Sequence, residues 1–368
     1  MRLFSILSSC LAPAALLALA ESGVAQDLTP PGVRVIAEHS IPAGLKIDGV
    51  AFGGLSSIER DPETGDFLAV SDDRAERGPA RFYRLRLEIE AGRAPAQAIT
   101  GLEIVGWTEL KAKDGWSYPA GAIDPEALRA APGGGFYLAT ESDGESGPSV
   151  TLLDAEGAFR ARLAPPLHHL PSAEAGVRDN QAYEALAVLP DGRIAVGLES
   201  ALKQDGPAAS VDQGALVRVT LYDPETRAAV AEHVYPIDPI AARPIPADGF
   251  ADAGLVALLA NPDGTLFALE RSFAVGQGNV VKLYLTTFGG ADDVLARASL
   301  SDGAAPPRAM AKRLVHSFQA GGAHQRVDNL EGVAFGPEID GAPTLVFVSD
   351  DNFNSGRQVT QFIVLGLD

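Results

Sequence analysis

Three glutamates share one offset from a proline that ends a candidate β-strand. Glu126, Glu184 and Glu331 each stand six residues before such a proline, in the segments "EALRAAP", "EALAVLP" and "EGVAFGP". Each opens a run of small and apolar residues that is typical of a buried strand. An unpaired buried carboxylate is costly or takes up a proton, so three repeats of the same cost predict a shared partner.

Further acidic residues follow the strand that comes after each of these runs. They are Asp72 and Asp73, Glu141 and Asp143, Glu199, Glu270, Asp350 and Asp351. If these side chains meet, like charges raise one another's pKa unless a metal ion, basic residues or shared protons compensate. Oxygen ligands alone favour a hard cation such as Ca²⁺, although another divalent cation remains an alternative. The predicted metal ligands are Glu126, Glu184, Glu331, Asp72, Glu141 and Asp350.

Basic and amide residues lie beside these acidic positions in the sequence. Arg74, Arg178, Arg271 and Asn352 are predicted to bind substrate, or in the case of the arginines to form salt bridges with the acids. The length of the preceding loop leaves open whether Glu270 or Arg271 faces inward. Few cations are expected near the acidic positions, which favours a small ester or lactone over a highly phosphorylated substrate.

Catalytic signatures are sparse. The sequence contains no G-x-S-x-G and no H-E-x-x-H segment, so neither a serine hydrolase elbow nor a zincin motif is present. His324, which follows a glycine-rich loop, and Asp351 are the candidates for a catalytic group. His168 and His169 are adjacent, and neighbours in an extended segment point to opposite sides, so a structural or surface role is predicted for them.

The segments that position these residues repeat along the chain. Five predicted hairpins start at residues 55, 125, 183, 255 and 330, and each of the first four is followed by two more strand-like runs. The fifth is followed only by "TQFIVLGL", and "GVRVIAEHSI" near the N-terminus supplies the missing strand. This pattern predicts an all-β, five-bladed β-propeller, with six blades as the alternative. Ser56 and Val256 occupy the glutamate position in blades one and four. The start of the first strand and the end of the second then meet at one mouth.

Composition limits the location and the partners of the protein. Residues 1–26 have the features of a signal peptide, with cleavage predicted near residues 20–26, so a periplasmic or secreted protein with a single domain over 27–368 is expected. The only cysteine is Cys10, which leaves no disulfide in the mature chain. A net charge of −19 argues against nucleic acid and anionic membranes as partners, and no membrane span is predicted. The oligomeric state is not predicted.

The hairpin segments resemble a known family. "FGGLSSIERDPETGDFLAVSDDR", "GVRDNQAYEALAVLPDG" and above all "DNLEGVAFGPEIDGAPTLVFVSDDNFN" are similar to the phytase-like, or esterase-like, β-propeller family of exported bacterial proteins. The third motif of that family usually reads N-x-G-F-E, whereas here Ala182 replaces the glycine and the aromatic residue is Tyr183. The resemblance implies hydrolysis of an ester or phosphoester and supplies no catalytic residue.

Two hypotheses follow from these patterns. The first is an exported metal-dependent hydrolase that acts on a small-molecule ester, lactone or phosphoester. The second is a non-catalytic binding or scaffold propeller whose acidic mouth is a structural cation site or is plugged by salt bridges.

Overall fold

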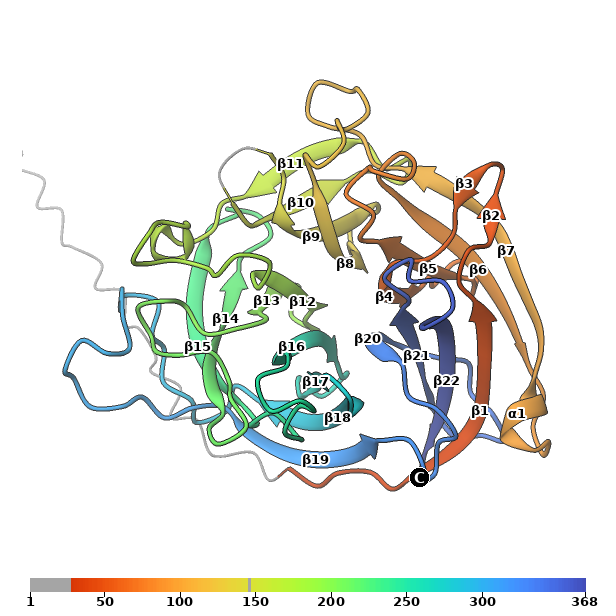
Figure 1. Cartoon of the computed structure of the whole chain (residues 1–368). Helices are drawn as coiled ribbons and strands as arrows, with labels where there is room; N and C mark the ends of the chain where they lie inside the picture. Colours follow the sequence, from red (N-terminus) through yellow and green to blue (C-terminus); the bar gives the residue numbers. More distant parts are fainter. Residues whose placement is uncertain (1–27, 145–146) are drawn as a thin grey trace, which may run out of the picture.

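Five four-stranded antiparallel sheets surround a common axis in the computed structural model, which describes residues 28–144 and 147–368 (Figure 1). Blade one contains β4 (Leu55–Arg60), β5 (Phe67–Ser71), β6 (Arg81–Ile89) and β7 (Ile99–Glu109). Blade two contains β8 (Asp124–Ala130), β9 (Phe136–Ser142), β10 (Ser149–Leu153) and β11 (Phe159–Leu163). Blade three contains β12 (Tyr183–Val188), β13 (Ile194–Leu198), β14 (Ala215–Tyr222) and β15 (Ala229–Ile237). Blade four contains β16 (Ala251–Ala260), β17 (Leu266–Ala274), β18 (Gly278–Thr287) and β19 (Ala311–Phe318).

Blade five joins the two ends of the chain. Its first three strands are β20 (Asn329–Phe335), β21 (Thr344–Asp350) and β22 (Val359–Leu367), and β1 (Val33–Pro42) is the fourth. β1 pairs with β22 from Val33 opposite Leu367 to Pro42 opposite Val359, so the ring closes through backbone hydrogen bonds. The predicted five-bladed propeller with a closing N-terminal strand is therefore confirmed. Among the described residues there is no sixth four-stranded sheet.

The remaining elements are short. They are the β2 (Lys46–Ile47) and β3 (Val50–Ala51) ribbon, α1 (Pro95–Ala98) and the 3₁₀ helix η1 (Leu167–His169). No helix in the described part of the chain is long and apolar enough to cross a membrane. The predicted signal peptide lies outside the described residues.

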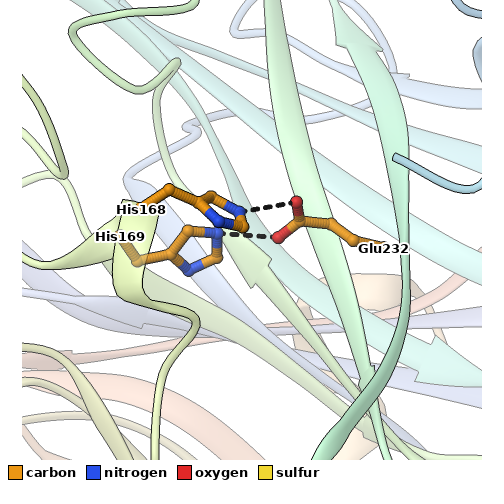
Figure 2. Close-up of side chains that lie close together, drawn as sticks. All are labelled: His168, His169 and Glu232. Carbon is orange, nitrogen blue, oxygen red and sulfur yellow. Dashed lines mark hydrogen bonds and ion pairs between the residues drawn. The ribbon is translucent and has the colours of Figure 1, made fainter. Parts of the chain in front are cut away.

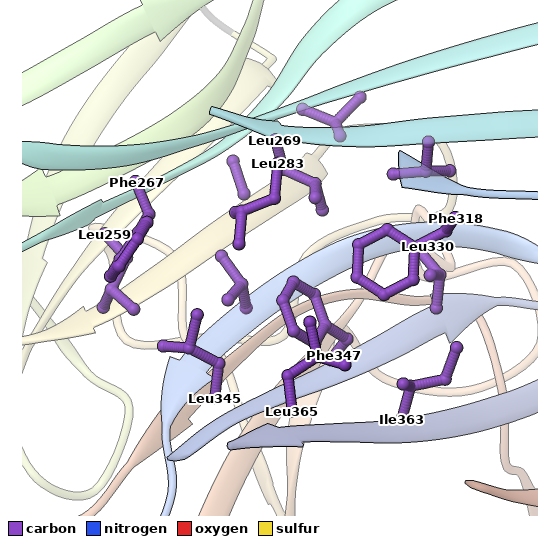
Figure 3. Packing of buried hydrophobic residues seen from close by; sticks show 14 of the residues in the cluster. Leu259, Phe267, Leu269, Leu283, Phe318, Leu330, Leu345, Phe347, Ile363 and Leu365 are labelled. Carbon is purple, nitrogen blue, oxygen red and sulfur yellow. The ribbon is translucent and has the colours of Figure 1, made fainter. Parts of the chain in front are cut away.

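Hydrophobic packing fills the five gaps between neighbouring blades, with one cluster of buried residues in each gap. Between blades four and five, Phe267 and Leu269 from β17 face Leu345 and Phe347 from β21 (Figure 3). Phe318 packs edge to face on Phe347, with 4.9 Å between the ring centroids. Because both faces of each sheet are covered, the strands consist of nearly continuous apolar runs rather than strict alternations.

A β-bulge interrupts every innermost strand at the same place. In each blade the register between the first and second strand shifts around one residue, and the five residues are Ser56, Glu126, Glu184, Val256 and Glu331. A bulge inserts one unpaired residue and redirects its side chain. The offset seen in the sequence is therefore a repeated backbone feature, and in the three blades that carry a glutamate it directs that side chain to the mouth.

A single arginine joins all five blades just below these bulges. Arg129, which is 3% exposed, donates hydrogen bonds to five backbone oxygens, each two residues after a bulge. The acceptors and distances are Ile58 O at 2.6 Å, Leu128 O at 3.3 Å, Leu186 O at 2.9 Å, Leu258 O at 2.9 Å and Val333 O at 3.1 Å. The guanidinium group therefore lies on the propeller axis and closes the channel below the mouth.

Candidate functional site

The mouth of the propeller holds a cavity of about 1110 Å³. Its lining combines acidic residues from the inner strands with residues of the loops at residues 72–77 and 350–358. The acidic lining residues are Asp72, Asp73, Glu76, Asp124, Glu126, Glu184, Glu199, Asp252, Asp328, Glu331 and Asp350. All three repeated glutamates thus reach one cavity, as the repeat predicted.

The five bulge residues form an inner ring of side chains, and a second ring surrounds them. On the second strand of each blade, the residue before the bulge has a pairing partner, and the residue that follows this partner is Asp72, Glu141, Glu199, Arg271 or Asp350 in blades one to five. Four are carboxylates, and blade four alone presents a guanidinium. Blade four also has Val256 at the bulge, so at these two positions it is the one blade without a carboxylate. Of the two neighbours Glu270 and Arg271, whose orientation the sequence left open, Arg271 lines the cavity and Glu270 does not.

Glu270 has a different environment on the same strand. Its carboxylate accepts hydrogen bonds from the Tyr235 hydroxyl at 2.7 Å and the Asp238 backbone N–H at 2.9 Å, and it pairs with Lys312. Adjacent strand residues face opposite sides, so Arg271 and Glu270 cannot both reach the mouth. Glu270 therefore anchors blade three to blade four.

Two glycines leave room for carboxylates of the second ring. Gly54 and Gly254 stand two residues before Ser56 and Val256, in the two blades that lack the inner glutamate. A Cβ atom at Gly54 would lie 2.2 Å from Oδ1 of Asp72, and one at Gly254 would lie 2.2 Å from Cγ of Glu199. These distances are far shorter than van der Waals contact. The two carboxylates therefore occupy positions that any other residue at 54 or 254 would block.

Burial raises the pKa of most carboxyl groups in the cavity. Burial, followed by the charges of neighbouring acids, raises the pKa of Asp72, Glu126, Glu184 and Asp350 well above the usual range. Burial likewise raises the pKa of Glu141 to about 7. Without a cation, several of these groups therefore carry a proton near neutral pH.

Arg271 offsets part of this effect. Burial raises the pKa of Glu199 and of Glu331 to about 8 in each case, although the charge of Arg271 acts in the opposite direction. Nη2 of Arg271 lies 2.9 Å from Oε1 of Glu199, and its Nε lies 3.5 Å from Oε1 of Glu331. Burial alone would lower the pKa of Arg271, but Glu331 and Glu199 outweigh it and raise the pKa. The guanidinium therefore stays charged and compensates two acids.

Two groups of three carboxylates have the geometry to hold a cation. Asp124, Glu126 and Glu141 form one group, and Glu141, Glu184 and Glu199 form the other; within each, the candidate ligand atoms lie within 4.8 Å of one another. Glu141 belongs to both, and its carboxylate also accepts a hydrogen bond from the Ala182 backbone N–H. Oxygen donors at this spacing fit a hard divalent cation such as Ca²⁺.

The other predicted metal ligands, from blades one and five, line the same cavity. The Asn329 side-chain amide donates to Oε1 of Glu331 at 2.9 Å and to Oδ2 of Asp350 at 3.2 Å. Asp72 lines the cavity beside them. Asp124 was missed by the sequence reasoning, although its position two residues before Glu126 on a strand was a usable signal.

Two of the predicted substrate-binding residues, besides Arg271, lie at the mouth. Arg74 lines the cavity, where Nε and Nη2 contact the two Asp124 carboxylate oxygens at 2.8 and 2.6 Å. Its other contact is the side chain of Asn180. Asn352 also lines the cavity, and its backbone N–H donates to Oδ1 of Asp350 at 2.6 Å.

Arg178 does not line the cavity. Its guanidinium donates to Ala201 O at 2.9 Å and Gly206 O at 2.6 Å, which ties two loops of blade three together. A guanidinium that is held by two backbone carbonyls away from the cavity has no route to a substrate there. The structure therefore places Arg178 apart from the other predicted substrate-binding residues.

The two predicted catalytic candidates also lie outside the cavity. His324 is buried and contacts Glu38 of β1, while its Nε2 lies 2.8 Å from Nε2 of His316 on β19. Asp351 is fully buried and accepts hydrogen bonds from the backbone N–H groups of Gly54 and Phe353, both at 3.0 Å. Both side chains therefore make their polar contacts outside the cavity.

The expectation of few cations at the mouth is wrong. Five arginines line the cavity: Arg74, Arg77, Arg271, Arg326 and Arg357. Arg77 lies over the Phe353 ring at 4.5 Å, and Arg326 pairs with Asp328 at 2.6 Å. The loops at residues 72–77 and 350–358 bring these charges together, which local sequence could not show.

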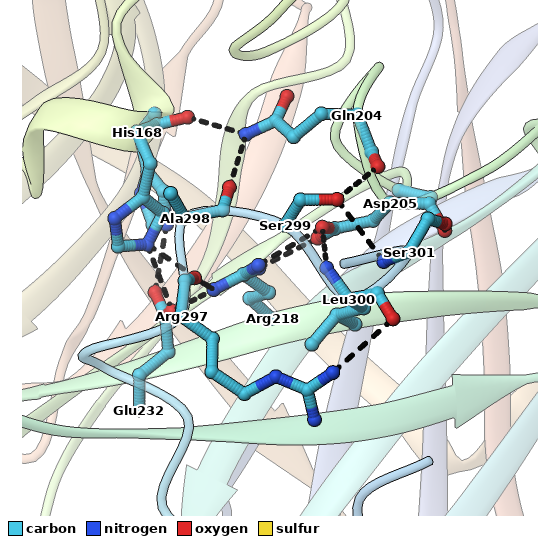
Figure 4. A network of polar contacts seen from close by, with 12 residues as sticks. His168, Gln204, Asp205, Arg218, Glu232, Arg297, Ala298, Ser299, Leu300 and Ser301 are labelled. Carbon is cyan, nitrogen blue, oxygen red and sulfur yellow. Dashed lines mark hydrogen bonds and ion pairs between the residues drawn. The ribbon is translucent and has the colours of Figure 1, made fainter. Parts of the chain in front are cut away.

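His168 and His169 belong to a separate buried network on the outer side of blade three. Contrary to the expectation for an extended segment, they lie in η1, and both rings reach Glu232 of β15 at 2.9 and 2.7 Å (Figure 2). Nη1 of Arg218 lies 2.5 Å from the same carboxylate and 3.2 Å from His168 Nε2 (Figure 4). The guanidinium therefore supplies a positive charge to Glu232 within this group, and the predicted structural role fits this geometry.

Comparison with known proteins places the site in a family. A family model described as "Phytase-like: Esterase-like activity of phytase" matches residues 50–353. The chain belongs to this phytase-like family. The matched segment of the phytase-like chain contains all five inner hairpins, and with them both rings of the mouth.

Other comparisons add less. A comparison with curated protein sequences gives no match. Among solved structures, the phytase-like chain is similar to the "crystal structure of a GH43_12 retrieved from capybara gut metagenome", with 12% sequence identity and a TM-score of 0.42. The alignment covers 92% of this chain and 54% of that one, so the chain spans about half the length of that structure.

Proposed function

We propose that the chain is an exported hydrolase that uses a divalent cation, Ca²⁺ by preference, to cleave an ester, lactone or phosphoester in the mouth cavity. The observation that carries this proposal is the pair of three-carboxylate groups that share Glu141. Asp124, Glu126, Glu184 and Glu199 of these groups line the same cavity as Arg271, so most of the cation site and an anion-binding group face one space. The family description, which refers to esterase-like activity, supports the same class of reaction.

The residues divide into ligands and substrate-binding groups. Asp124, Glu126, Glu141, Glu184 and Glu199 would hold the cation, and Asp72, Glu331 and Asp350 line the cavity beside them. A cation bound there would polarise the carbonyl or phosphoryl oxygen of the substrate. Arg271 would orient an anionic oxygen of the substrate, because its buried charge stays available beside two partly protonated acids.

Glu331 is the proposed general base. Its pKa of about 8 lies within about one unit of neutral pH, where a group that accepts and returns a proton is effective. Asn329 donates to one of its oxygens at 2.9 Å and so orients the carboxylate. Glu331 would accept a proton from the attacking water and thereby replace His324, whose ring packs between β19 and β1.

The test combines activity with cation binding. The mature protein is assayed with aryl esters, lactones and phosphoesters in Ca²⁺ or in a chelator, and Ca²⁺ affinity is measured by calorimetry. Glu331→Gln is expected to lower kcat by roughly 10²- to 10⁴-fold with little loss of Ca²⁺ affinity. Glu270→Gln is the matched control, because Glu270 is a buried neighbour of Arg271 that faces away from the cavity. Absence of turnover with every substrate class would exclude the hydrolase.

The non-catalytic alternative has one specific observation in its favour. Arg271 pairs with Glu199 and Arg74 pairs with Asp124, so part of the acidic charge is compensated within the chain. A scaffold propeller with a structural cation predicts Ca²⁺-dependent thermal stability without turnover. The same assays therefore separate the two functions. Export is tested by N-terminal sequencing of the protein recovered from the periplasm or the medium.

A further inference from the structure

We propose that the blade-four wall of the cavity is a subsite for an apolar group of aromatic size, and that the substrate is an ester that carries such a group beside its reacting end. This inference rests on the proposed function and specifies its substrate class. The residues that form the subsite are Phe250 and Phe273, next to Arg271.

The wall has a linear arrangement from the floor of the cavity to its rim. Arg271 and Phe273 are two residues apart on β17, where their partners on β16 are Gly254 and Asp252 in regular register. Residues at this spacing share one face of a strand and lie roughly 7 Å apart. The Phe250 ring packs on the Phe273 ring with centroids 6.2 Å apart. Arg271, Phe273 and Phe250 therefore form one continuous surface that lines the cavity.

The exposure of Phe250 is the second observation. Its relative exposure is 65%, so it contributes little to the core of blade four. Nine large apolar side chains are exposed among the described residues, and Phe250 is the one of these that lines the mouth cavity. A single exposed apolar residue on a surface needs no explanation, but one that extends a half-buried ring beside a charged site is a contact surface for a ligand.

The chemistry of this wall selects the ligand. Phenyl rings offer no hydrogen bond, so a polar or charged group placed against them would lose its hydration without compensation. A substrate that is charged over its whole surface is therefore disfavoured along this wall. Both the charged part of the wall, Arg271, and its apolar part, the two phenyl rings, fit one kind of ligand. That ligand is an ester that places an anionic or carbonyl oxygen at Arg271 and an aryl or branched acyl group toward the rim.

The test uses two probes that differ only in the apolar group. Binding of benzylphosphonate and methylphosphonate to the mature protein in Ca²⁺ is measured by calorimetry, and saturation-transfer NMR follows the aromatic protons. The expected result is at least about tenfold tighter binding of benzylphosphonate, lost in Phe250→Ala and Phe273→Ala and largely kept in Phe250→Leu. Trp116→Ala is the control, because Trp116 is 75% exposed and does not line the cavity.

The outcomes separate this inference from the proposed function. Equal affinity for the two probes, no detectable binding of either, or an unchanged preference in Phe250→Ala would overturn the subsite even if esters are hydrolysed. A benzyl preference that depends on Phe250, in a protein that hydrolyses none of the substrates above, would support the subsite and reject the hydrolase. Aryl esters that are turned over with a preference that depends on Phe250 would support both.

Discussion

Replacing Arg129 by methionine tests whether one guanidinium holds the five blades together. The substitution keeps the length of the apolar stem and removes donors to five backbone oxygens at 2.6 to 3.3 Å. It also leaves Glu59, whose Oε2 lies 3.3 Å from Nη1, without its charged partner. Burial raises the pKa of Glu59 and Arg129 opposes that shift, so the variant favours the protonated form of Glu59.

The expected loss in the free energy of unfolding depends on the polar groups left unpaired, and it is smaller than the sum of the hydrogen-bond energies. Five charge-assisted hydrogen bonds at about 1.5–3 kcal/mol each would give roughly 7–15 kcal/mol, as much as the whole stability of a typical domain. Water that enters the space will satisfy part of the carbonyls, so the loss measured on breaking a buried charged contact, ~3–5 kcal/mol, is the better guide. With an unfolding entropy of about 2.1 cal/mol/K per residue, roughly 340 residues convert ~4 kcal/mol into a Tm decrease of roughly 6 °C.

Chemical and thermal unfolding of Arg129→Met against the parent protein measure this directly. Arg243→Met is the matched control, because the Arg243 side chain is 72% exposed and pairs with an equally exposed Asp212; a change within about 0.5 kcal/mol is expected there. Arg129→Lys should fall between the two, since an ammonium group cannot reach five carbonyls at once. If Arg129→Met loses less than about 1 kcal/mol, the guanidinium does not hold the blades together, and the reasoning fails.

Three further predictions concern the cavity. Glu141→Gln should weaken Ca²⁺ binding by at least about tenfold in calorimetry because the residue belongs to both carboxylate groups, and unchanged affinity would remove it from the site. In chelator, the Tm should fall as the pH rises from about 5 to 8. The reason is that Glu141, Glu199 and Glu331 have pKa values of about 7, 8 and 8 in the folded protein, so they keep protons that glutamates of the unfolded chain release at their usual, lower pKa. Ca²⁺ should make the Tm less dependent on pH, and a Tm that rises over this range without Ca²⁺ would contradict the raised pKa values. Gly254→Ala should displace Glu199 and lower the free energy of unfolding by about 1–3 kcal/mol in denaturant unfolding. Gly106→Ala is the control and should be near neutral, because a Cβ atom there meets nothing within 4 Å. Equal effects of the two substitutions would argue against the close approach of Glu199 to Gly254.

The prediction of the architecture succeeded because its signals are local. Prolines after short apolar runs mark strand ends, and the same spacing before Pro132, Pro190 and Pro337 revealed the repeat. The closing strand followed from counting, since one blade lacked a partner and one segment lacked a sheet. The site was predicted only in part. The three glutamates reach one cavity, yet neither His324 nor Asp351 faces it.

By itself the sequence determined which residue types repeat and at what spacing, and so the five blades and the acidic mouth. Only the tertiary structure decided which member of each neighbouring pair faces the cavity, because side chains alternate along a strand and one bulged residue reverses the phase. Asp350 lines the mouth while Asp351 is buried beneath Gly54, and Arg271 faces inward while Glu270 does not. The role of Arg129 depends on five carbonyls from five blades, contacts over as many as 204 residues of sequence, and no local pattern carries such information.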